Sequence, residues 1–388
     1  MNINIAETYY GKKIDTANIL NIEDASKLIS DKKVIVVTGV TGQDGSHMVD
    51  FLLKNTDYLI FGGVRRLSVY NHENIKHIKS DRFKLINFDL TDSHAISRTI
   101  EKLQPDYFIN FAAQSFVASS WDFSRQTWQT NSTAVLDILE AIRLYKPSCR
   151  FYQAGSSEEF GNVEYTPQDE KHPLKPRSPY GASKAASRQL VKVYRESYNL
   201  YAIQGWLFNH EGTRRGEEFV TRKITKNIAR INYAIKNNLD FNPLELGNLD
   251  AKRDWSDAED FIEGVWMMLN QDKFNLNYDG IPKEYVLSSN ETHSIREFVE
   301  KGFSNVGING GWIYIGDGRD EDEGFYYKNK DGNYILLVKI NSKFYRPAEV
   351  ELLLGDSSKA RKELNWKPKV SFDDLVKKMI DFDIKNYK

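Results

Sequence analysis

Lys32–Asn55 has the sequence KKVIVVTGVTGQDGSHMVDFLLKN, and its order of residue types is the clearest indication of the fold. It opens with a short β-branched run that ends in Thr-Gly, a pattern typical of a buried parallel strand. Gly39, Gly42 and Gly45 follow, and the remainder to Asn55 has its apolar residues on one stripe of a helix. Glycines in this order allow a tight turn, bring backbone N–H groups near a pyrophosphate and let the helix pack closely on the strand. The helix N-terminus then faces the anion, so the stretch predicts a dinucleotide-binding site.

Strands and helices continue to alternate as far as about residue 209. The predicted strands are 58–66, 82–90, 107–113, 150–156 and 201–209, and the predicted helices are 96–104, 133–146 and 178–199. Helices of this length between strands indicate βαβ units and a parallel sheet. The predicted fold class is therefore α/β, a Rossmann-type doubly wound parallel sheet with a smaller irregular α/β C-terminal domain.

Three regions are expected along the chain. The first is an N-terminal extension at 1–30, with one short helix at 21–30. The second is a cofactor-binding domain at 31–208, to which a later segment near 253–272 returns. The third is a mainly substrate-binding domain at 209–388. No chemistry is predicted for the extension. In the last region, an Asp-Gly pair at 331–332 indicates a hairpin-like turn, and the aromatic-rich runs 311–316 and 333–338 predict core strands.

Composition narrows the class of protein. The 388 residues are 40% hydrophobic, enough for a sizeable core, and their formal net charge of -1 argues against nucleic acid or an anionic membrane as the main partner. The single cysteine, Cys149, leaves no disulfide framework within the chain and no Cys-rich metal site. Histidines show no ligand spacing, and the acidic run 319–324 is expected to be a solvated loop, so no metal is predicted. With no apolar run of about 18 residues and no secretory signal at the N-terminus, a cytoplasmic protein is expected.

The second predicted strand ends in Val64, Arg65 and Arg66. A site that prefers NAD usually has an acidic residue here to bind the ribose 2′-OH, whereas arginine suits a 2′-phosphate. The sequence therefore favours NADP as the cofactor, the alternative being that one or both arginines are plain surface charges.

A possible acid/base pair lies in the predicted helix 178–199. Tyr180 and Lys184 are four residues apart, so both side chains share one helix face. A lysine ammonium near a phenol favours the phenolate and lowers the pKa of the tyrosine. Tyr180 is thus a candidate acid/base for a sugar hydroxyl while hydride leaves the same carbon.

The segment after the predicted strand 150–156 contains a second candidate. Ser156 and Glu158 share a face if the chain is extended there, at the carboxyl edge of the sheet where such folds bind ligands. Ser156 would hydrogen-bond a substrate oxygen beside Tyr180, and Glu158 would supply a second acid/base that a simple dehydrogenase lacks. Ser157 and Glu159 would point the other way and are interpreted as structural.

With these elements in place, the chain resembles the extended short-chain dehydrogenases/reductases and, within them, the GDP-mannose 4,6-dehydratase family. The resemblance runs from about Lys33 to the C-terminus. Among the strings that carry it are GVTGQDGS, GVRR, RSPYGASK, LFNHE, RRGEEFVTRKI, LGNLDAKRDWSDAEDF and LNWKP. The long GNLDAKRDW segment is far more specific than any glycine pattern.

The resemblance implies conversion of GDP-mannose to GDP-4-keto-6-deoxymannose, in which the sugar is oxidised at C4, loses water across C5 and C6, and regains hydride at C6. It assigns the catalytic positions of the family to Ser156, Glu158, Tyr180 and Lys184. Cofactor contacts carry over to Gly39, Val40, Thr41, Gly42, Gln43, Asp44, Arg65, Asp89, Leu90, Ala113, Ser115, Tyr180, Lys184, His210 and Arg215. Contacts to the GDP-sugar carry over to Ser156, Asn209, Val220, Lys223, Arg253, Arg346 and Glu349. The arginines and the lysine supply charge and forked donors for a diphosphate.

This sequence departs from the family pattern at several positions. The usual STSELYG is here GSSEEFG, so Ser156 keeps the hydroxyl of threonine but loses its methyl group and the rotamer control that comes with it. The usual serine-rich segment after the two arginines is LSVYNH. In the family that loop helps to join subunits at a shared cofactor edge. The resemblance implies a homo-oligomer, either a dimer or a tetramer, and this departure weakens the expectation of a tetramer. A tyrosine that the family uses near the cofactor falls on Gln126, and HESPRRG has become HEGTRRG.

Rival functions stay open at this point. A 4-epimerase would use Tyr180 and Lys184 but has no need of Glu158, and the dTDP-glucose 4,6-dehydratases carry an aspartate where Ser157 stands. Another GDP-sugar such as a GDP-heptose would need only a changed pocket shape. A catalytically silent NADP-binding scaffold would have lost at least one of the four catalytic positions, all of which are present here.

Overall fold

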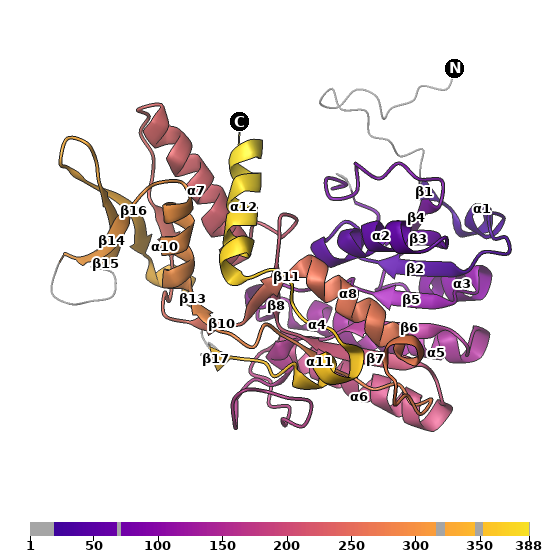
Figure 1. The fold of residues 1–388 in the computed structure, drawn as a ribbon. Coiled ribbons are helices and arrows are strands. Elements are labelled where there is room, and N and C mark those ends of the chain that lie inside the picture. Colours follow the sequence, from indigo (N-terminus) through magenta and orange to yellow (C-terminus); the bar gives the residue numbers. More distant parts are fainter. Residues whose placement is uncertain (1–18, 68–70, 316–322, 346–351, 388) are drawn as a thin grey trace, which may run out of the picture. The chain divides into compact units, whose positions relative to one another are not determined.

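A computed structural model describes residues 19–67, 71–315, 323–345 and 352–387 of the chain (Figure 1). Its largest element is an eight-stranded sheet with the order β1-β4-β3-β2-β5-β6-β7-β12. These strands are β1 (Ile19–Leu20), β2 (Val34–Thr38), β3 (Leu59–Val64), β4 (Phe83–Asn87), β5 (Tyr107–Asn110), β6 (Arg150–Ala154), β7 (Ala202–Leu207) and β12 (Val286–Leu287). The strand pairs of this sheet whose register is known are parallel. The predicted α/β class with a parallel sheet is confirmed.

Several helices of the described residues start at a side chain that caps the helix N-terminus. The helices are α1 (Ile22–Ser26), α2 (Gln43–Asn55), α3 (Ser93–Leu103), α4 (Ser124–Trp128), α5 (Ala134–Tyr145), α6 (Pro179–Tyr198), α7 (Val220–Lys236), α8 (Ala258–Leu269), α9 (Gln271–Phe274), α10 (Ile295–Asn305), α11 (Ser358–Leu364) and α12 (Phe372–Asn386). Asp92 is the N-cap of α3, and its side chain accepts from the backbone N–H groups of His94 and Ala95. Ser371 is the N-cap of α12, and its hydroxyl accepts from the backbone N–H of Asp374. None of the helices in the described residues is both long and apolar enough to cross a membrane.

The chain divides into two compact units, each of which has its own core. Unit 1 comprises residues 1–113, 129–153 and 189–203, and unit 2 comprises 114–128, 154–188 and 204–388. In unit 1, β-branched and aromatic side chains of the parallel strands pack against α3 and α5. Its fully buried core includes Val36, Phe61, Ile100, Phe108 and Ile138.

Unit 2 contains a second, four-stranded sheet with the order β14-β15-β16-β9. Its strands are β14 (Gly310–Tyr314), β15 (Glu323–Lys328), β16 (Tyr334–Ile340) and β9 (Leu244–Leu246). Helices α7, α10 and α12 lie together beside this sheet (Figure 1), and their apolar faces share one core with it. Short pairs complete the unit, namely β8 (Asn209–Glu211) with β11 (Trp255–Asp257), and β10 (Lys252–Arg253) with β13 (His293–Ser294) and β17 (Leu352–Leu353).

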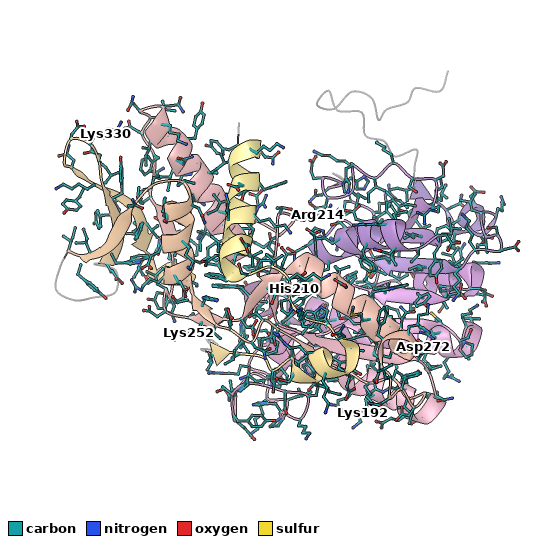
Figure 2. All side chains as sticks on the ribbon, in the orientation of Figure 1. Lys192, His210, Arg214, Lys252, Asp272 and Lys330 are labelled. Carbon is teal, nitrogen blue, oxygen red and sulfur yellow. The ribbon has the colours of Figure 1, made fainter. Side chains whose placement is uncertain are left out.

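Three expectations about local structure are settled here. The Asp-Gly turn does join two antiparallel strands, because Lys328 of β15 pairs with Tyr334 of β16, and Lys330 lies at the tip of this hairpin (Figure 2). The run 311–316 was expected to be a core strand, but β14 is the edge strand of its sheet and Tyr314 is 58% exposed. The N-terminal helix is shorter than predicted, and Ile19 and Leu20 add a strand beside β4.

Candidate active site

The glycine loop of unit 1 has the close backbone packing that the sequence predicted. Gly39 has a φ of 68°, and a Cβ atom there would lie 2.8 Å from the backbone nitrogen of Ala112. A Cβ atom on Gly45 would lie 2.3 Å from the carbonyl oxygen of Gly39. Gly42 is the N-cap of helix α2, and no side chain caps this helix. The start of this helix therefore presents backbone N–H groups with no side chain of the cap residue in competition, which suits a phosphate.

A buried chain of polar groups supports this loop from the strands. The Thr38 hydroxyl donates to Asn110 Oδ1 at 2.5 Å and accepts from the backbone N–H of Ala112 at 3.0 Å. Asn110 Nδ2 in turn donates to Gln153 Oε1 at 2.7 Å. These bonds connect the carboxyl ends of β2, β5 and β6, so the loop is fixed on a rigid sheet edge.

The other proposed cofactor contacts in unit 1 follow strand ends. Arg65 is exposed directly after β3, as is Arg66. Asp89, after β4, accepts from the backbone N–H of Thr91 at 2.9 Å, and the Leu90 side chain is buried. In the glycine loop, Val40 is fully buried and Gln43 is 7% exposed. The backbone carbonyl oxygen of Thr41 accepts from Asn74 Nδ2 at 2.9 Å. These positions gather at the loops that follow parallel strands, as the fold requires.

A group of side chains in unit 2 surrounds the phenol of Tyr180, on the first turn of α6. The Ser156 side chain hydrogen-bonds the phenol, and the charges of Glu158 and Arg215 both act on it. The Lys184 ammonium lies 5.9 Å from the centroid of the Tyr180 ring and donates to the carbonyl oxygen of Ala154 at 2.7 Å. The structure thus brings the four predicted catalytic positions together in one unit.

Two details of this group differ from expectation. Residues Ser157–Glu159 form a 3-10 turn that Ser156 caps by accepting from the backbone N–H of Glu158 at 3.2 Å. An extended segment was predicted, but the chain turns here, and a Cβ atom on Gly181, the residue after Tyr180, would lie 2.6 Å from the Glu158 carbonyl oxygen. Burial raises the pKa of Tyr180 to about 12, with Glu158 acting in the same direction and the Ser156 hydrogen bond opposing it. The lowered pKa expected from Lys184 is therefore not found, because the desolvation of the phenol dominates.

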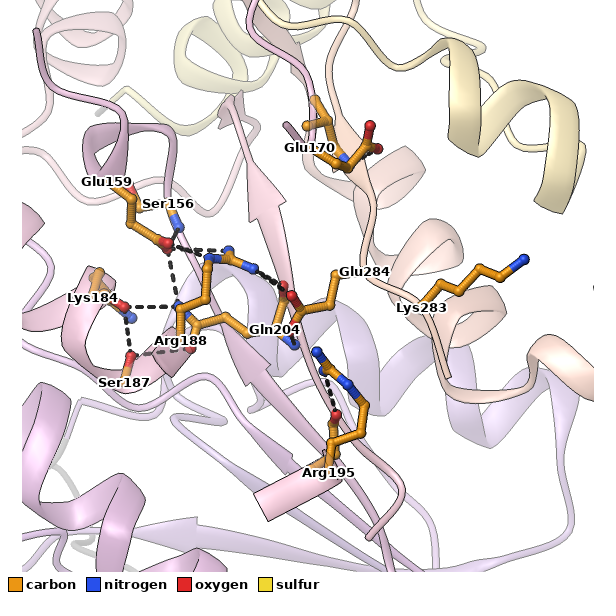
Figure 3. Close-up of polar contacts among 12 residues, drawn as sticks. Ser156, Glu159, Glu170, Lys184, Ser187, Arg188, Arg195, Gln204, Lys283 and Glu284 are labelled. Atoms are coloured by element: carbon orange, nitrogen blue, oxygen red, sulfur yellow. Dashed lines mark hydrogen bonds and ion pairs between the residues drawn. The ribbon is translucent and has the colours of Figure 1, made fainter. Parts of the chain in front are cut away.

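Beneath Ser156 lies a buried ionic network that sequence reasoning did not assemble (Figure 3). Glu159, interpreted from the sequence as structural, is fully buried and forms an ion pair with Arg188 at 2.5 Å. Gln204, a polar residue inside a predicted buried strand, hydrogen-bonds the same carboxylate at 3.0 Å. Polar residues in otherwise apolar segments were the only signal of this network in the sequence. The pairing itself is not a local pattern, because Arg188 and Gln204 are 29 and 45 residues away from Glu159 along the chain.

The remaining positions of unit 2 that the resemblance selects lie on β8, α7 and β10 and in the segments beside them. His210, on β8 (Figure 2), stacks on Phe261 with ring centroids 4.8 Å apart. Arg215 lies 3.0 Å from the buried Glu211 carboxylate, with its guanidinium over the ring of Phe219. Asn209 is half-buried on β8, Val220 begins α7, and Ser115 is exposed.

Two basic side chains of this set are withdrawn from water. The Lys223 ammonium is 3.4 Å from the ring centroid of Phe344, and burial lowers the pKa of Lys223. Arg253 is 8% exposed and donates to the carbonyl oxygen of Lys252 at 2.8 Å. Partly desolvated cations of this kind bind an anionic ligand more strongly than surface charges do. Arg346 and Glu349 lie outside the described residues, as do residues 319–322 of the acidic run. Within the described ranges, no three His, Cys, Asp or Glu side chains gather so as to hold a metal ion.

Comparison with known proteins agrees with this architecture. Residues 36–379 match the family model described as GDP-mannose 4,6 dehydratase. The chain is 44% identical over 364 residues to GDP-mannose 4,6 dehydratase of Drosophila melanogaster, an alignment that covers 92% of this chain and 87% of the fly protein. It is 40% identical over 362 residues to the Homo sapiens GDP-mannose 4,6 dehydratase, covering 91% and 92% of the two chains. The solved UDP-glucuronic acid 4-epimerase from Bacillus cereus superposes with a TM-score of 0.72 at 22% identity over 91% of this chain and all of the epimerase chain, which supports the fold alone.

Proposed function

The chain belongs to the GDP-mannose 4,6-dehydratase family, and we propose that it converts GDP-mannose to GDP-4-keto-6-deoxymannose by elimination of water. The observation that carries the proposal is the convergence of Ser156 and Glu158 on the Tyr180 phenol. Tyrosine beside lysine is sufficient for oxidation at C4. A carboxylate whose charge acts on the same phenol adds the second acid/base that elimination across C5 and C6 requires.

The glycine loop fits a dinucleotide, and we propose NADP. Support for a dinucleotide comes from the uncapped start of α2 and from Gly39 and Gly45, where a Cβ atom would clash with backbone. Support for the 2′-phosphate form comes from Arg65, exposed directly after β3. When bound, the nicotinamide ring supplies a hydride acceptor for C4 and a hydride donor for C6, so the cofactor ends the cycle as it began.

The protein side chains would manage the protons. Tyr180 takes the O4 proton while Ser156 hydrogen-bonds a substrate oxygen. Glu158 removes the C5 proton and passes it to the departing C6 hydroxyl, which leaves as water. When hydride returns to C6, C5 regains a proton from the Tyr180 phenol, so both side chains end as they began. Because burial raises the pKa of Tyr180 to about 12, the phenol is protonated in the free chain at neutral pH. Its activation depends on positive charge close to it, and Arg215 already acts in that direction.

We further propose that unit 2 binds the GDP-sugar through the positions that the resemblance selects. The partly desolvated cations Lys223 and Arg253 suit a diphosphate. Asn209 offers an amide group on β8, where it pairs with Trp255, two residues after Arg253. Arg346 and Glu349 are assigned to the same ligand by resemblance. In the same way, a homo-oligomer is proposed for the assembly and the cytoplasm for the compartment.

The test is incubation of the purified protein with GDP-mannose and a trace of NADP+, followed by mass spectrometry of the sugar nucleotide. Loss of one water with no lasting rise in NADPH absorbance is expected, because hydride returns to the product. Glu158→Gln should abolish the water loss while NADP still binds. An unchanged GDP-mannose peak with bound NADP would reject the proposed substrate, and the same assay with other GDP-sugars would then separate a different substrate from a silent scaffold.

A further inference from the structure

A buried polar network occupies a place in unit 2 where packing alone would call for apolar side chains (Figure 3). Glu159, Gln204 and Ser187 are fully buried, and Arg188 is 3% exposed. The residues come from three elements: the 3-10 turn after β6, helix α6 and strand β7. Figure 3 shows the Glu159 carboxylate at the point where the hydrogen bonds from these elements meet.

One oxygen of this carboxylate is linked to two of the proposed catalytic positions. Glu159 Oε1 accepts from the backbone N–H of Ser156 at 2.8 Å and from Gln204 Nε2 at 3.0 Å. The same Gln204 nitrogen donates to the backbone carbonyl oxygen of Lys184 at 2.9 Å. Ser187 Oγ is 2.8 Å from that carbonyl oxygen and 3.0 Å from Gln204 Oε1. The backbones of Ser156 and Lys184 are therefore joined through two side chains.

Arg188 holds the Glu159 carboxylate in this position. Its Nε donates to Glu159 Oε2 at 2.5 Å, and its Nη1 donates to the carbonyl oxygen of Gln204 at 2.6 Å. Glu284 Oε2 accepts from the same Nη1 at 3.1 Å. The guanidinium also stacks 3.4 Å from the ring centroid of Trp206. Each of these contacts restrains the rotation of the guanidinium, so the carboxylate has little freedom to turn away from Ser156.

The energetics indicate that this network does not serve stability alone. Burying both charges costs several kcal/mol per ion, and well-packed apolar residues of similar volume often give equal or greater stability. What apolar residues cannot supply is an acceptor for the Ser156 N–H. We propose that Glu159 is a positioning residue, which places the Ser156 hydroxyl on the Tyr180 phenol and, through Gln204, fixes the Lys184 turn of α6. The inference rests on the dehydratase function proposed above.

Two double variants separate the acceptor for the Ser156 N–H, called the anchor below, from the ion pair between Glu159 and Arg188. Glu159→Leu with Arg188→Met removes both the ion pair and the acceptor for the Ser156 N–H. Glu159→Gln with Arg188→Met removes the same ion pair but keeps an amide oxygen that can accept from Ser156. The two variants have matched volumes and the same net charge, so they differ in the anchor and not in the loss of the pair.

We expect the Leu/Met variant to lower kcat for GDP-mannose on the order of 10- to 100-fold, because a small misplacement of a reacting group has effects of this size. KM should change less than kcat in both variants, since the contacts proposed for Lys223 and Arg253 with the diphosphate are left in place. The Gln/Met variant should recover most of the wild-type kcat. Equal kcat values in the two variants would overturn the proposal.

Hydrogen exchange gives a readout that does not depend on turnover. The Ser156 amide should exchange slowly in the wild type and in the Gln/Met variant, and much faster in the Leu/Met variant. Wild-type protein that is inactive on GDP-mannose would reject the proposed function, and the exchange comparison would still decide on the anchor. Where the Leu/Met variant does not fold, Gln204→Met serves as the test, because it leaves the ion pair in place. It should lower kcat with KM unchanged, and an unchanged kcat would overturn the role of the bridge to Lys184.

Discussion

The glycine loop of unit 1 and the Tyr180 group of unit 2 are built on different principles. The loop is made of backbone: it depends on the absence of Cβ atoms at Gly39 and Gly45 and on an uncapped helix start. The Tyr180 group is made of side chains, held from below by the buried pair of Glu159 and Arg188. The first needs residues that are adjacent in sequence, whereas the second needs partners from distant segments. The two regions should therefore fail in different ways when single residues are changed.

The largest effect is expected from Tyr180→Phe. Removing the hydroxyl deletes the acid/base that acts on O4, so kcat should fall by at least about 10²-fold, within the range found for general acid–base groups. The ring that packs in the buried site remains and Tyr180 is one of many proposed cofactor contacts, so NADP affinity should fall far less than kcat. Mass spectrometry of the water loss from GDP-mannose measures the change in kcat. Titration with NADP by fluorescence measures the cofactor affinity. Retained turnover would show that another group takes the proton.

Gly45→Ala tests the backbone-built region. A Cβ atom there would lie 2.3 Å from the Gly39 carbonyl oxygen, so the loop must shift. We expect a loss of stability of about 1–3 kcal/mol, typical of overpacking, and weaker NADP binding by about tenfold because the N–H groups move from the phosphate. Gly311→Ala is the matched control, because nothing lies within 4 Å of a Cβ atom at that position. Unfolding in denaturant and NADP titration measure the two effects, and equal behaviour of both variants would contradict the role of close packing.

Arg65→Ala should change which cofactor the loop prefers. Loss of a guanidinium that meets a 2′-phosphate should weaken NADP by about tenfold while leaving NAD nearly unchanged, because only NADP carries that group. Arg66→Ala, one position further along the same exposed segment, is the matched comparison and should change the ratio of the two affinities less. Titration of each variant with both cofactors gives the ratio, and a parallel loss of NAD binding would point to a structural effect instead.

The smallest expected effect is a pH dependence in the side-chain-built unit. Burial raises the pKa of Asp254 to about 6, against hydrogen bonds from Ser289, Gly355 and Asn290 that oppose the rise. The folded chain then keeps a proton that the unfolded chain releases near the ordinary aspartate pKa of 3.8. Stability from this group is therefore fully present below that value and is lost as the pH rises through about 6.

Compared with Asp254→Asn, the wild type should lose about 1 kcal/mol of unfolding free energy between pH 5 and pH 7, since one pKa unit corresponds to about 1.4 kcal/mol. Urea unfolding of both proteins at the two pH values is the measurement. The variant removes the titrating group, so a pH dependence that is identical in the two proteins would show that Asp254 does not titrate in this range.

Local patterns predicted the parallel sheet and the glycine loop because they depend on short-range sequence order. The β-branched run, the three glycines and the amphipathic stripe lie within Lys32–Asn55, and the structure places them as β2, the loop and α2. The turn between β15 and β16 was predicted for the same reason, since its Asp-Gly signal lies within residues 329–333, between the paired Lys328 and Tyr334. Edge and centre positions in a sheet depend on which strands pair, and this is why β14 was wrongly expected in the core.

The sequence by itself determined the fold class, the glycine loop and the identities of the side chains available for chemistry, because periodicity and motif spacing act over a few residues. The three-dimensional structure was needed to show that Ser157–Glu159 form a 3-10 turn and that burial raises the pKa of the Tyr180 phenol. It alone joined Glu159 to Arg188 and Gln204, which are 29 and 45 residues away along the chain. Desolvation and long-range pairing are properties of the packed interior, and no local pattern of residues contains them.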